Sequence, residues 1–170
     1  MHRHDGFREL ARRECLRLLP QVPLGRVVYT ENALPAVLPV HFLVDHDHAV
    51  VLRTSAASRM ARAVDGGVVA FEVDSFDEAT RSGWSVVVTG RAALVTDPDE
   101  AERLARRGPV AWAPVEDGIH VRIEPELVTG RVLQGVAAAR PVSPDTAGEA
   151  RPGHRPGVRA CGSAGSATRS

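Results

Sequence analysis

This sequence has few cysteines, no excess of charge of either sign, and no apolar run at its N-terminus. The 170 residues include only 2 cysteines, Cys15 in an early helical segment and Cys161 in the C-terminal tail, so we expect no stabilising disulfide. The chain has 21 basic and 21 acidic side chains, whereas a protein that neutralises nucleic-acid phosphates needs a basic excess. Residues 1–9 are mostly charged and polar, so we expect neither a signal peptide nor a membrane span there. These features predict a cytoplasmic protein with no nucleic-acid or membrane partner.

The composition that is present predicts one folded domain followed by a tail. Hydrophobic residues make up 44% of the chain and charged residues 25%, which is typical of a globular domain. After about Leu133 the composition changes, and from Ala137 onward the chain consists mainly of Ala, Pro, Gly, Arg, Ser and Thr. Such a segment buries too little apolar surface to offset its ordering entropy. We therefore expect a folded domain over residues 1–136 and a disordered low-complexity tail over 137–170.

Most of the folded part has the pattern of β-strands joined by short turns. The spacing of apolar residues predicts helices over Phe7–Leu19, Ser55–Val64 and Pro98–Arg107. Runs rich in valine and other apolar residues predict strands over Gly25–Thr30, Ala36–Val44, Ala49–Thr54, Val68–Val73, Trp84–Val95, Ile119–Ile123 and Leu127–Leu133. Consecutive strands are close enough in sequence for antiparallel pairing. The pattern therefore indicates a mainly β fold, and a small barrel rather than a doubly wound sheet.

One short segment has the composition of a phosphate site. Residues 53–59 (Arg-Thr-Ser-Ala-Ala-Ser-Arg) contain two arginines and three hydroxyl side chains at the expected start of a helix. Helix N-termini offer unpaired N–H groups, hydroxyls add short hydrogen bonds, and guanidinium groups match phosphate oxygens. The alternative interpretation is an ordinary serine N-cap flanked by two surface arginines.

Two other polar groups have simpler interpretations. Asp45, His46, Asp47 and His48 resemble a metal cluster, but alternate residues of an extended segment point to opposite faces, so we expect a solvated turn and no metal. Glu72 and Asp74 share a strand face, which suits an acid/base pair or, as we prefer, structural hydrogen bonding.

Several segments together resemble the pyridoxamine 5′-phosphate oxidase-like FMN-binding split barrels, in particular their actinobacterial branch. The matching segments lie in the same order over residues 9 to 133, and the tail lies outside the match. They include Gly25-Arg26-Val27, Leu52-Arg53-Thr54 with Ser58-Arg59, Val69 to Asp74, Gly83 to Arg91, and Thr129-Gly130-Arg131. The resemblance implies a six-stranded antiparallel split β-barrel with short flanking helices, and a homodimer that holds FMN between its subunits.

The resemblance also implies positions for the cofactor. In proteins of this kind the Arg-Thr strand end and the following Ser-basic pair hold the FMN phosphate, which implies Arg53, Thr54, Ser58 and Arg59 here, next to the hydroxyl of Ser55. Many relatives carry lysine where Arg59 stands, and arginine keeps the charge with a different geometry. Other implied contacts are the strand beside the flavin ring edge (Pro39, Val40, His41) and the strand that reaches the cofactor from the dimer mate (Trp84, Ser85). Trp112 could cap the flavin pocket or plug the barrel end.

The resemblance leaves the reaction open. One reading is an FMN-dependent oxidoreductase acting on an unknown small organic substrate, with no catalytic side chain identified. The alternatives are a non-catalytic flavin- or heme-binding module and an oxidoreductase that uses the deazaflavin coenzyme. The last third of the chain lacks the Arg-Leu-His-x-Arg segment that binds the pyridoxal substrate in true pyridoxamine phosphate oxidases, so we do not expect that specific activity.

Overall fold

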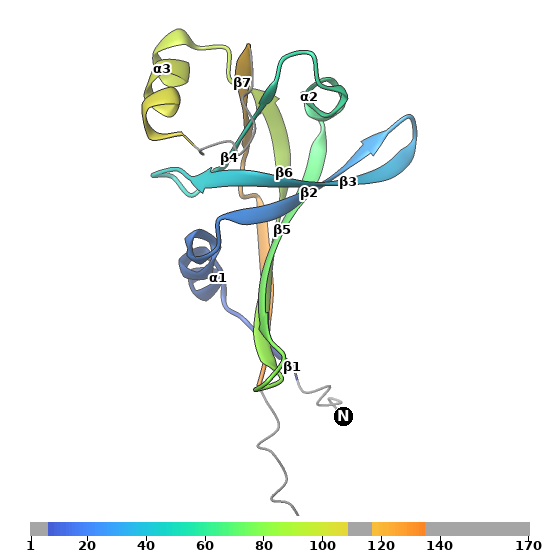
Figure 1. Ribbon diagram of the computed structural model, residues 1–170, viewed down its shortest axis with the longest axis vertical. Coiled ribbons are helices and arrows are strands. Elements are labelled where there is room, and N and C mark those ends of the chain that lie inside the picture. Colours follow the sequence, from blue (N-terminus) through green and yellow to red (C-terminus); the bar gives the residue numbers. More distant parts are fainter. Residues whose placement is uncertain (1–6, 109–116, 135–170) are drawn as a thin grey trace, which may run out of the picture. The chain divides into compact units, whose positions relative to one another are not determined.

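The computed structural model describes residues 7–108 and 117–134, which form a mainly β domain with short helices (Figure 1). The expectations for the tail over 137–170 and for Trp112 lie outside the described residues. The strands are β1 (Phe7–Glu9), β2 (Leu24–Glu31), β3 (Leu34–Val44), β4 (Val50–Ser55), β5 (Val68–Asp77), β6 (Ser82–Leu94), β7 (Gly118–Ile123) and β8 (Leu127–Leu133). The helices are α1 (Arg12–Leu18), the 3-10 turn η1 (Leu19–Gln21), α2 (Arg59–Val64) and α3 (Pro98–Arg107).

Six of these strands close into an antiparallel barrel, which confirms the fold predicted from the sequence. The order is β6-β5-β2-β3-β4-β7, and β7 pairs back onto β6 through residues 92–94. The barrel interior holds a continuous apolar core in which the Phe42 and Phe71 rings meet edge to face, with centroids 4.8 Å apart. Valine dominates the inward positions because β-branched side chains pack well on a pleated surface.

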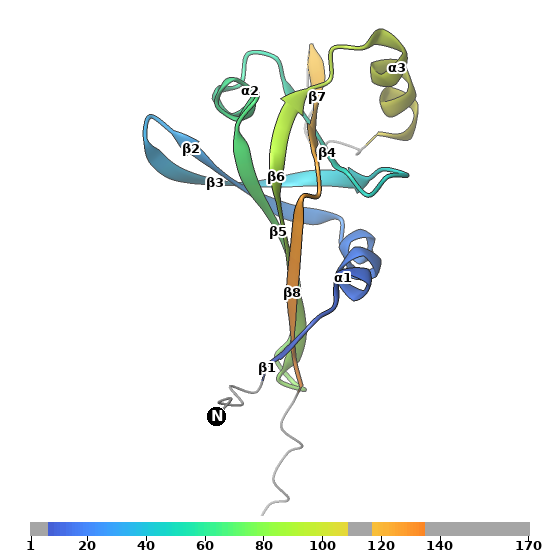
Figure 2. The same ribbon diagram turned by 180° about the vertical axis from the view of Figure 1, so that it is seen from behind.

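The barrel is split along one edge of β6. The first half of β6 pairs with β8 through residues 83–89, and the second half pairs with β7 (Figure 2). The chain crosses this edge at Gly90, where an added Cβ would lie 1.7 Å from the Glu124 carbonyl oxygen. Only glycine fits so close a backbone approach.

The N-terminal segment differs from the prediction of a helix from Phe7. Residues Phe7 to Glu9 instead form strand β1, which pairs with Arg131 to Leu133 of β8. The helix begins after Ala11, whose N–H donates to the Glu14 carboxylate at 2.8 Å. Pairing with a strand distant in sequence satisfied the backbone of this segment, and such long-range pairing is not visible in local periodicity. Ser55 instead ends β4 and residues 56–57 form a turn, so α2 begins four residues later than predicted.

The edge of β3 that faces away from β2 has no partner strand over residues 34–41 in the described chain. A two-residue turn, Asn32-Ala33, joins β2 to β3 with positive φ at both residues. The hydrogen-bonded pairs therefore begin at Glu31 and Leu34 and alternate along the hairpin, which leaves Pro35 and Pro39 in non-hydrogen-bonded pairs. Their nitrogens face the open edge, where a missing N–H costs nothing.

The outer face of the sheet carries an apolar stripe. Directly paired residues form a row across five strands: Val37, Val28, Ala70, Thr89 and Leu127. Paired residues of neighbouring antiparallel strands point to the same side. Val37 and Leu127 at the two ends are 59% and 57% exposed. Within the described residues, the helices are too short or too polar to cross a membrane.

Candidate functional site

The end of β4 brings together most of the hydroxyl groups of the predicted phosphate segment. Thr54 Oγ1 donates to Ser58 Oγ at 3.1 Å, and Ser58 Oγ also accepts the Ala61 N–H at 3.0 Å as the N-cap of α2. Ser58 therefore keeps its own hydroxyl proton for an incoming acceptor. Helix α2 has only 6 residues, so side chains rather than a helix dipole must hold an anion here.

Arg53 and Thr54 project from opposite faces of β4. Val50 and Leu52 belong to the core, which places Thr54 on the inner side at the barrel end and Arg53 on the outer side with Ser55. The Arg53 side chain lies over Gly118 of β7, where an added Cβ would meet Arg53 Nε at 2.7 Å. An anion at the tip of β4 can thus be approached by a guanidinium on one side and hydroxyls on the other.

Arg59 lies beside the β2–β3 hairpin rather than beside Arg53. Its Nε atom is 3.5 Å from the Glu31 carboxylate, and 79% of the side chain is exposed. It lines a pocket of about 340 Å³ together with Arg62, Thr30 and Asn32. A long exposed arginine changes rotamer readily, so Arg59 can exchange Glu31 for another anion.

His120 and Gly118 also belong to this region, and the sequence analysis missed both. His120 lies directly opposite Arg53 in the β4–β7 pairing and is only 5% exposed. Burial, followed by the charge of Arg53, holds the pKa of His120 below its usual range. The one available signal was the alternation of Gly118, His120 and Arg122 along a strand. It could not be connected to Arg53 without the strand register.

The predicted ring-edge residues lie on β3 at the point where that strand acquires a second partner. Pro39 is exposed, whereas Val40 and His41 are half-buried. Pairing with β4 begins only at Phe42. The three residues therefore border the open edge of β3.

Trp84 and Ser85 lie near the start of β6, away from the phosphate segment. Trp84 pairs with Val132 and lines a pocket of about 350 Å³ with residues of α1, including Arg17 and Leu18. Ser85 points to the outer face, paired with Asp74. No described residue of the phosphate segment lines this pocket. Within one chain, Trp84 and the phosphate segment therefore lie in two separate places.

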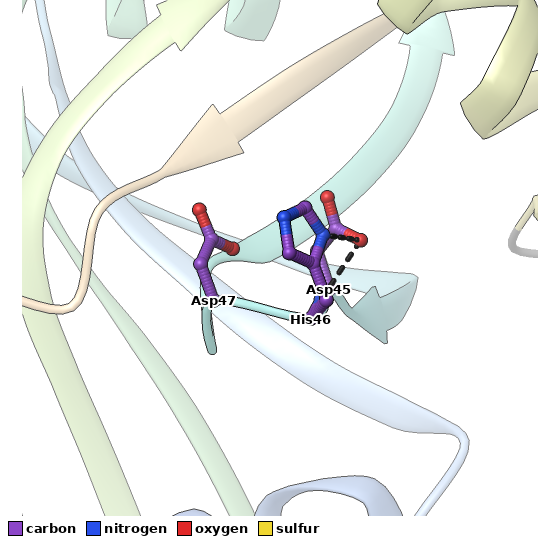
Figure 3. Close-up of side chains that lie close together, drawn as sticks. All are labelled: Asp45, His46 and Asp47. Carbon is purple, nitrogen blue, oxygen red and sulfur yellow. Dashed lines mark hydrogen bonds and ion pairs between the residues drawn. The ribbon is translucent and has the colours of Figure 1, made fainter.

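The acidic turn is an arginine-binding centre. Asp45, His46 and Asp47 rise together from the β3–β4 turn, with their ligand atoms within 4.8 Å of one another (Figure 3). The buried Asp45 carboxylate accepts two hydrogen bonds from Arg103, at 2.9 and 2.8 Å, and one from Arg122 at 3.1 Å. These bonds, Arg103 first, hold the pKa of Asp45 far below its usual range. Surrounding positive charge disfavours a metal cation, and the cluster instead attaches α3 to the barrel.

The predicted carboxylate pair also has a structural partner. Glu72 and Asp74 lie on one face, as expected, and Arg26 Nη1 is 3.0 Å from Glu72 and 3.2 Å from Asp74. Both carboxylates therefore serve an ion pair between β2 and β5.

The donor set around β4 suits a phosphate. It combines a guanidinium, a hydroxyl proton left over at Ser58, and a buried imidazole nitrogen without a described partner at His120. Guanidinium and hydroxyl donors are the groups that bind phosphate oxygens in proteins. The glycine at position 118 provides the space that the guanidinium occupies.

Comparisons with known proteins agree with this picture. The family model described as pyridoxamine 5′-phosphate oxidase matches residues 11–132. An uncharacterized protein of Mycobacterium tuberculosis, Rv0080, is 46% identical over 127 residues, which are 72% of this chain and 82% of that protein. The structure of an FAD binding protein from Mycobacterium smegmatis is 32% identical with a TM-score of 0.62, covering 74% of this chain and 97% of that one. A conserved protein of unknown function from Corynebacterium diphtheriae, DIP1874, is 32% identical with a TM-score of 0.65, covering 76% and 99%.

Proposed function

The chain belongs to the pyridoxamine 5′-phosphate oxidase family, and we propose that it binds FMN and uses it to oxidise or reduce a small organic substrate. The observation that carries the proposal is the donor set at the end of β4, where the Thr54–Ser58 hydroxyl pair lies on one side of the strand tip and the Arg53 guanidinium on the other. A bound flavin would supply the hydride chemistry, and the protein would bind and orient it.

The residues have separate tasks in this proposal. Arg53 provides charge-assisted hydrogen bonds to the phosphate, and the Ser58 hydroxyl adds a neutral one. Arg59 leaves Glu31 to join them. The open edge of β3 beside Pro39 to His41 offers backbone groups for the polar edge of the flavin ring, and its apolar side chains exclude water from that side.

We also propose that the active form is a homodimer, with Trp84 and Ser85 reaching the cofactor bound by the partner subunit. The apolar stripe on the outer face supports this, because its exposed ends, Val37 and Leu127, gain from burial in an interface. The separation of Trp84 from the phosphate segment within one chain also fits a shared site. Two-fold pairing is the commonest symmetry of soluble homo-oligomers.

FAD is the second candidate cofactor, because the pocket beside Arg59 could hold the nucleotide half of a dinucleotide. Arg62 faces this pocket together with Thr30 and Asn32, and these groups suit a second phosphate and ribose hydroxyls. The smegmatis relative is described as an FAD binding protein. An Arg62→Ala variant should lose FAD affinity and keep FMN affinity if the pocket is used in this way.

The test is a fluorescence titration of the purified protein with FMN, FAD and riboflavin. Replacing Arg53 and Arg59 together with alanine removes two charge-assisted contacts and should weaken FMN binding by roughly a thousandfold, equivalent to about 4 kcal/mol. Arg106→Ala on the exposed surface of α3 is the matched control and should bind normally. Unchanged affinity in the double variant would remove this site, and absence of flavin binding by the natural protein would overturn the function.

Mass and absorption spectra of the co-purifying molecule distinguish the remaining alternatives. A flavin spectrum with the mass of FMN supports the proposal, whereas a deazaflavin or heme spectrum contradicts it. Anaerobic reduction of the bound flavin, followed by reoxidation with small organic acceptors, separates an oxidoreductase from a non-catalytic binding module.

A further inference from the structure

His120 is a buried histidine whose Nε2 atom has no hydrogen-bonding partner in the described part of the chain. The residue is only 5% exposed. Leaving a buried polar atom unpaired costs about 1–3 kcal/mol, and native proteins keep few such atoms. The position therefore requires an explanation that the apolar packing of the barrel does not give.

The strand register places this imidazole at the buried side of the phosphate site. His120 of β7 is the direct partner of Arg53 of β4, and both side chains project from the outer face. Direct partners have Cβ atoms roughly 4.5–5.5 Å apart. Gly118, two residues earlier on the same face, leaves the space in which the Arg53 guanidinium lies. An anion held by Arg53 therefore lies within reach of the His120 ring.

The surroundings of His120 favour its neutral form in the unliganded protein. Burial and the positive charge of Arg53 lower its pKa, while Glu100 of α3 acts in the opposite direction. Arg122 is a further cation on the same face of β7, and its charge is largely used by Asp45, Asp47 and Glu124. A phosphate dianion beside Arg53 would add negative charge next to the imidazole, which favours its protonated form.

We propose, building on the phosphate site proposed above, that His120 is a further ligand of the cofactor phosphate. The imidazole takes up a proton from solvent as the phosphate binds, and it then donates an N–H to a phosphate oxygen. The step transfers one proton from water to the imidazole and forms one charge-assisted hydrogen bond. It removes the unpaired buried nitrogen and compensates the second negative charge of the phosphate. Flavin affinity and proton uptake are then linked.

Calorimetry of FMN binding in buffers with different ionisation enthalpies measures this linkage. The natural protein should take up protons on binding between pH 6 and 8, by up to about one proton per site, because a single imidazole titrates. His120→Gln keeps a neutral side chain that can still donate, so it should bind FMN with proton uptake reduced by the whole contribution of His120. The phosphate itself also titrates, with a second pKa of about 6. Its contribution cancels when the proton uptake of the variant is subtracted from that of the natural protein.

Equal proton uptake by the natural protein and His120→Gln would overturn the inference while leaving the flavin function intact. Absence of FMN binding by the natural protein would overturn the function and the inference together. Glu100→Gln is a second variant, at a half-buried residue of α3 that also contacts Arg103 and Arg122 but leaves His120 itself in place. It removes the acid that favours the imidazolium, so it should reduce proton uptake at the upper end of the pH range, and unchanged uptake would contradict the assignment to His120.

Discussion

Gly118 decides where the Arg53 guanidinium can lie. An added Cβ would be 2.7 Å from Arg53 Nε and 3.0 Å from Nη2, both in the far part of a flexible side chain. Gly118→Ala should therefore displace Arg53 and leave the barrel intact. Loss of one charge-assisted contact of about 1.5 kcal/mol predicts roughly tenfold weaker FMN binding in a fluorescence titration.

Gly90→Ala is the contrasting variant. There the added Cβ would meet a backbone carbonyl at 1.7 Å, which cannot move aside cheaply. This variant should lose about 1–3 kcal/mol or more of unfolding free energy in urea.

If Gly118→Ala binds FMN normally, the position of the Arg53 guanidinium over Gly118 is not the one that holds phosphate.

The sequence could group only those residues of the candidate site that lie close together in the chain. Arg53, Thr54 and Ser58 lie within six residues of one another, so their hydroxyls and guanidinium could be grouped without a structure. His120 comes from a strand more than sixty residues later, and a one-residue change of register would turn it to the other face. Distance in sequence, rather than unusual chemistry, is what concealed it.

At the scale of elements, Asp45 attaches α3 to the barrel. Its fully buried carboxylate accepts hydrogen bonds from Arg103 of α3 and Arg122 of β7. Asp45→Asn leaves these arginines without their shared anion and should cost roughly 3 kcal/mol of unfolding free energy, at the lower end for a broken buried pair because the arginines are partly exposed. Chemical denaturation measures this loss.

Asp47→Asn is the matched control, since Asp47 also contacts Arg122 but is an exposed residue of the same turn. A surface ion pair is worth about 0–1 kcal/mol, so this variant should unfold almost as the natural protein does. Similar losses in the two variants would show that the network does not depend on the buried carboxylate.

Two groups predict that acid destabilises the domain, in separate pH windows. The depressed pKa of Asp45 contributes stability above its unfolded value of 3.8, and this is lost as pH falls further. The lowered pKa of His120 means that the unfolded chain binds the proton first, so stability declines as pH falls below about 6.5. In His120→Gln, the slope of unfolding free energy against pH should become smaller near pH 6. In Asp45→Asn, the slope should become smaller below pH 4. An unchanged slope in either variant would remove that residue from the account.

The elements themselves were largely predictable, because most strands alternate or run as valine-rich segments between polar turns. Predicted Leu127–Leu133 coincides with β8, and predicted Pro98–Arg107 coincides with α3. Strand β1 was missed since Phe7 to Glu9 is too short to show a period of two. Its pairing with β8 depends on the far end of the domain.

For the whole molecule, the proposed dimer makes the outer stripe essential for flavin binding. Val37→Asp places a charge at an exposed position of the stripe, where the monomer tolerates it but an interface does not. We expect light scattering to give a monomer, and FMN affinity to fall because the partner's Trp84 and Ser85 are lost.

Leu34→Asp is the control for this substitution. Leu34 is 68% exposed and lies at the hairpin end of β3, three residues from Val37 and hence on the opposite face. This variant should remain dimeric and bind FMN. A Val37→Asp protein that stays dimeric, or a stable FMN-bound monomer, would contradict the interface.

The two prolines on the open edge of β3 also affect how the protein behaves at high concentration. An unpaired strand edge is a template on which another chain can add a strand and begin aggregation. Pro35 and Pro39 remove the outward N–H at two points of that edge. The carbonyl groups of an added strand would therefore have no N–H donor at those points. The same edge can thus stay open to a small molecule while being closed to fibril growth.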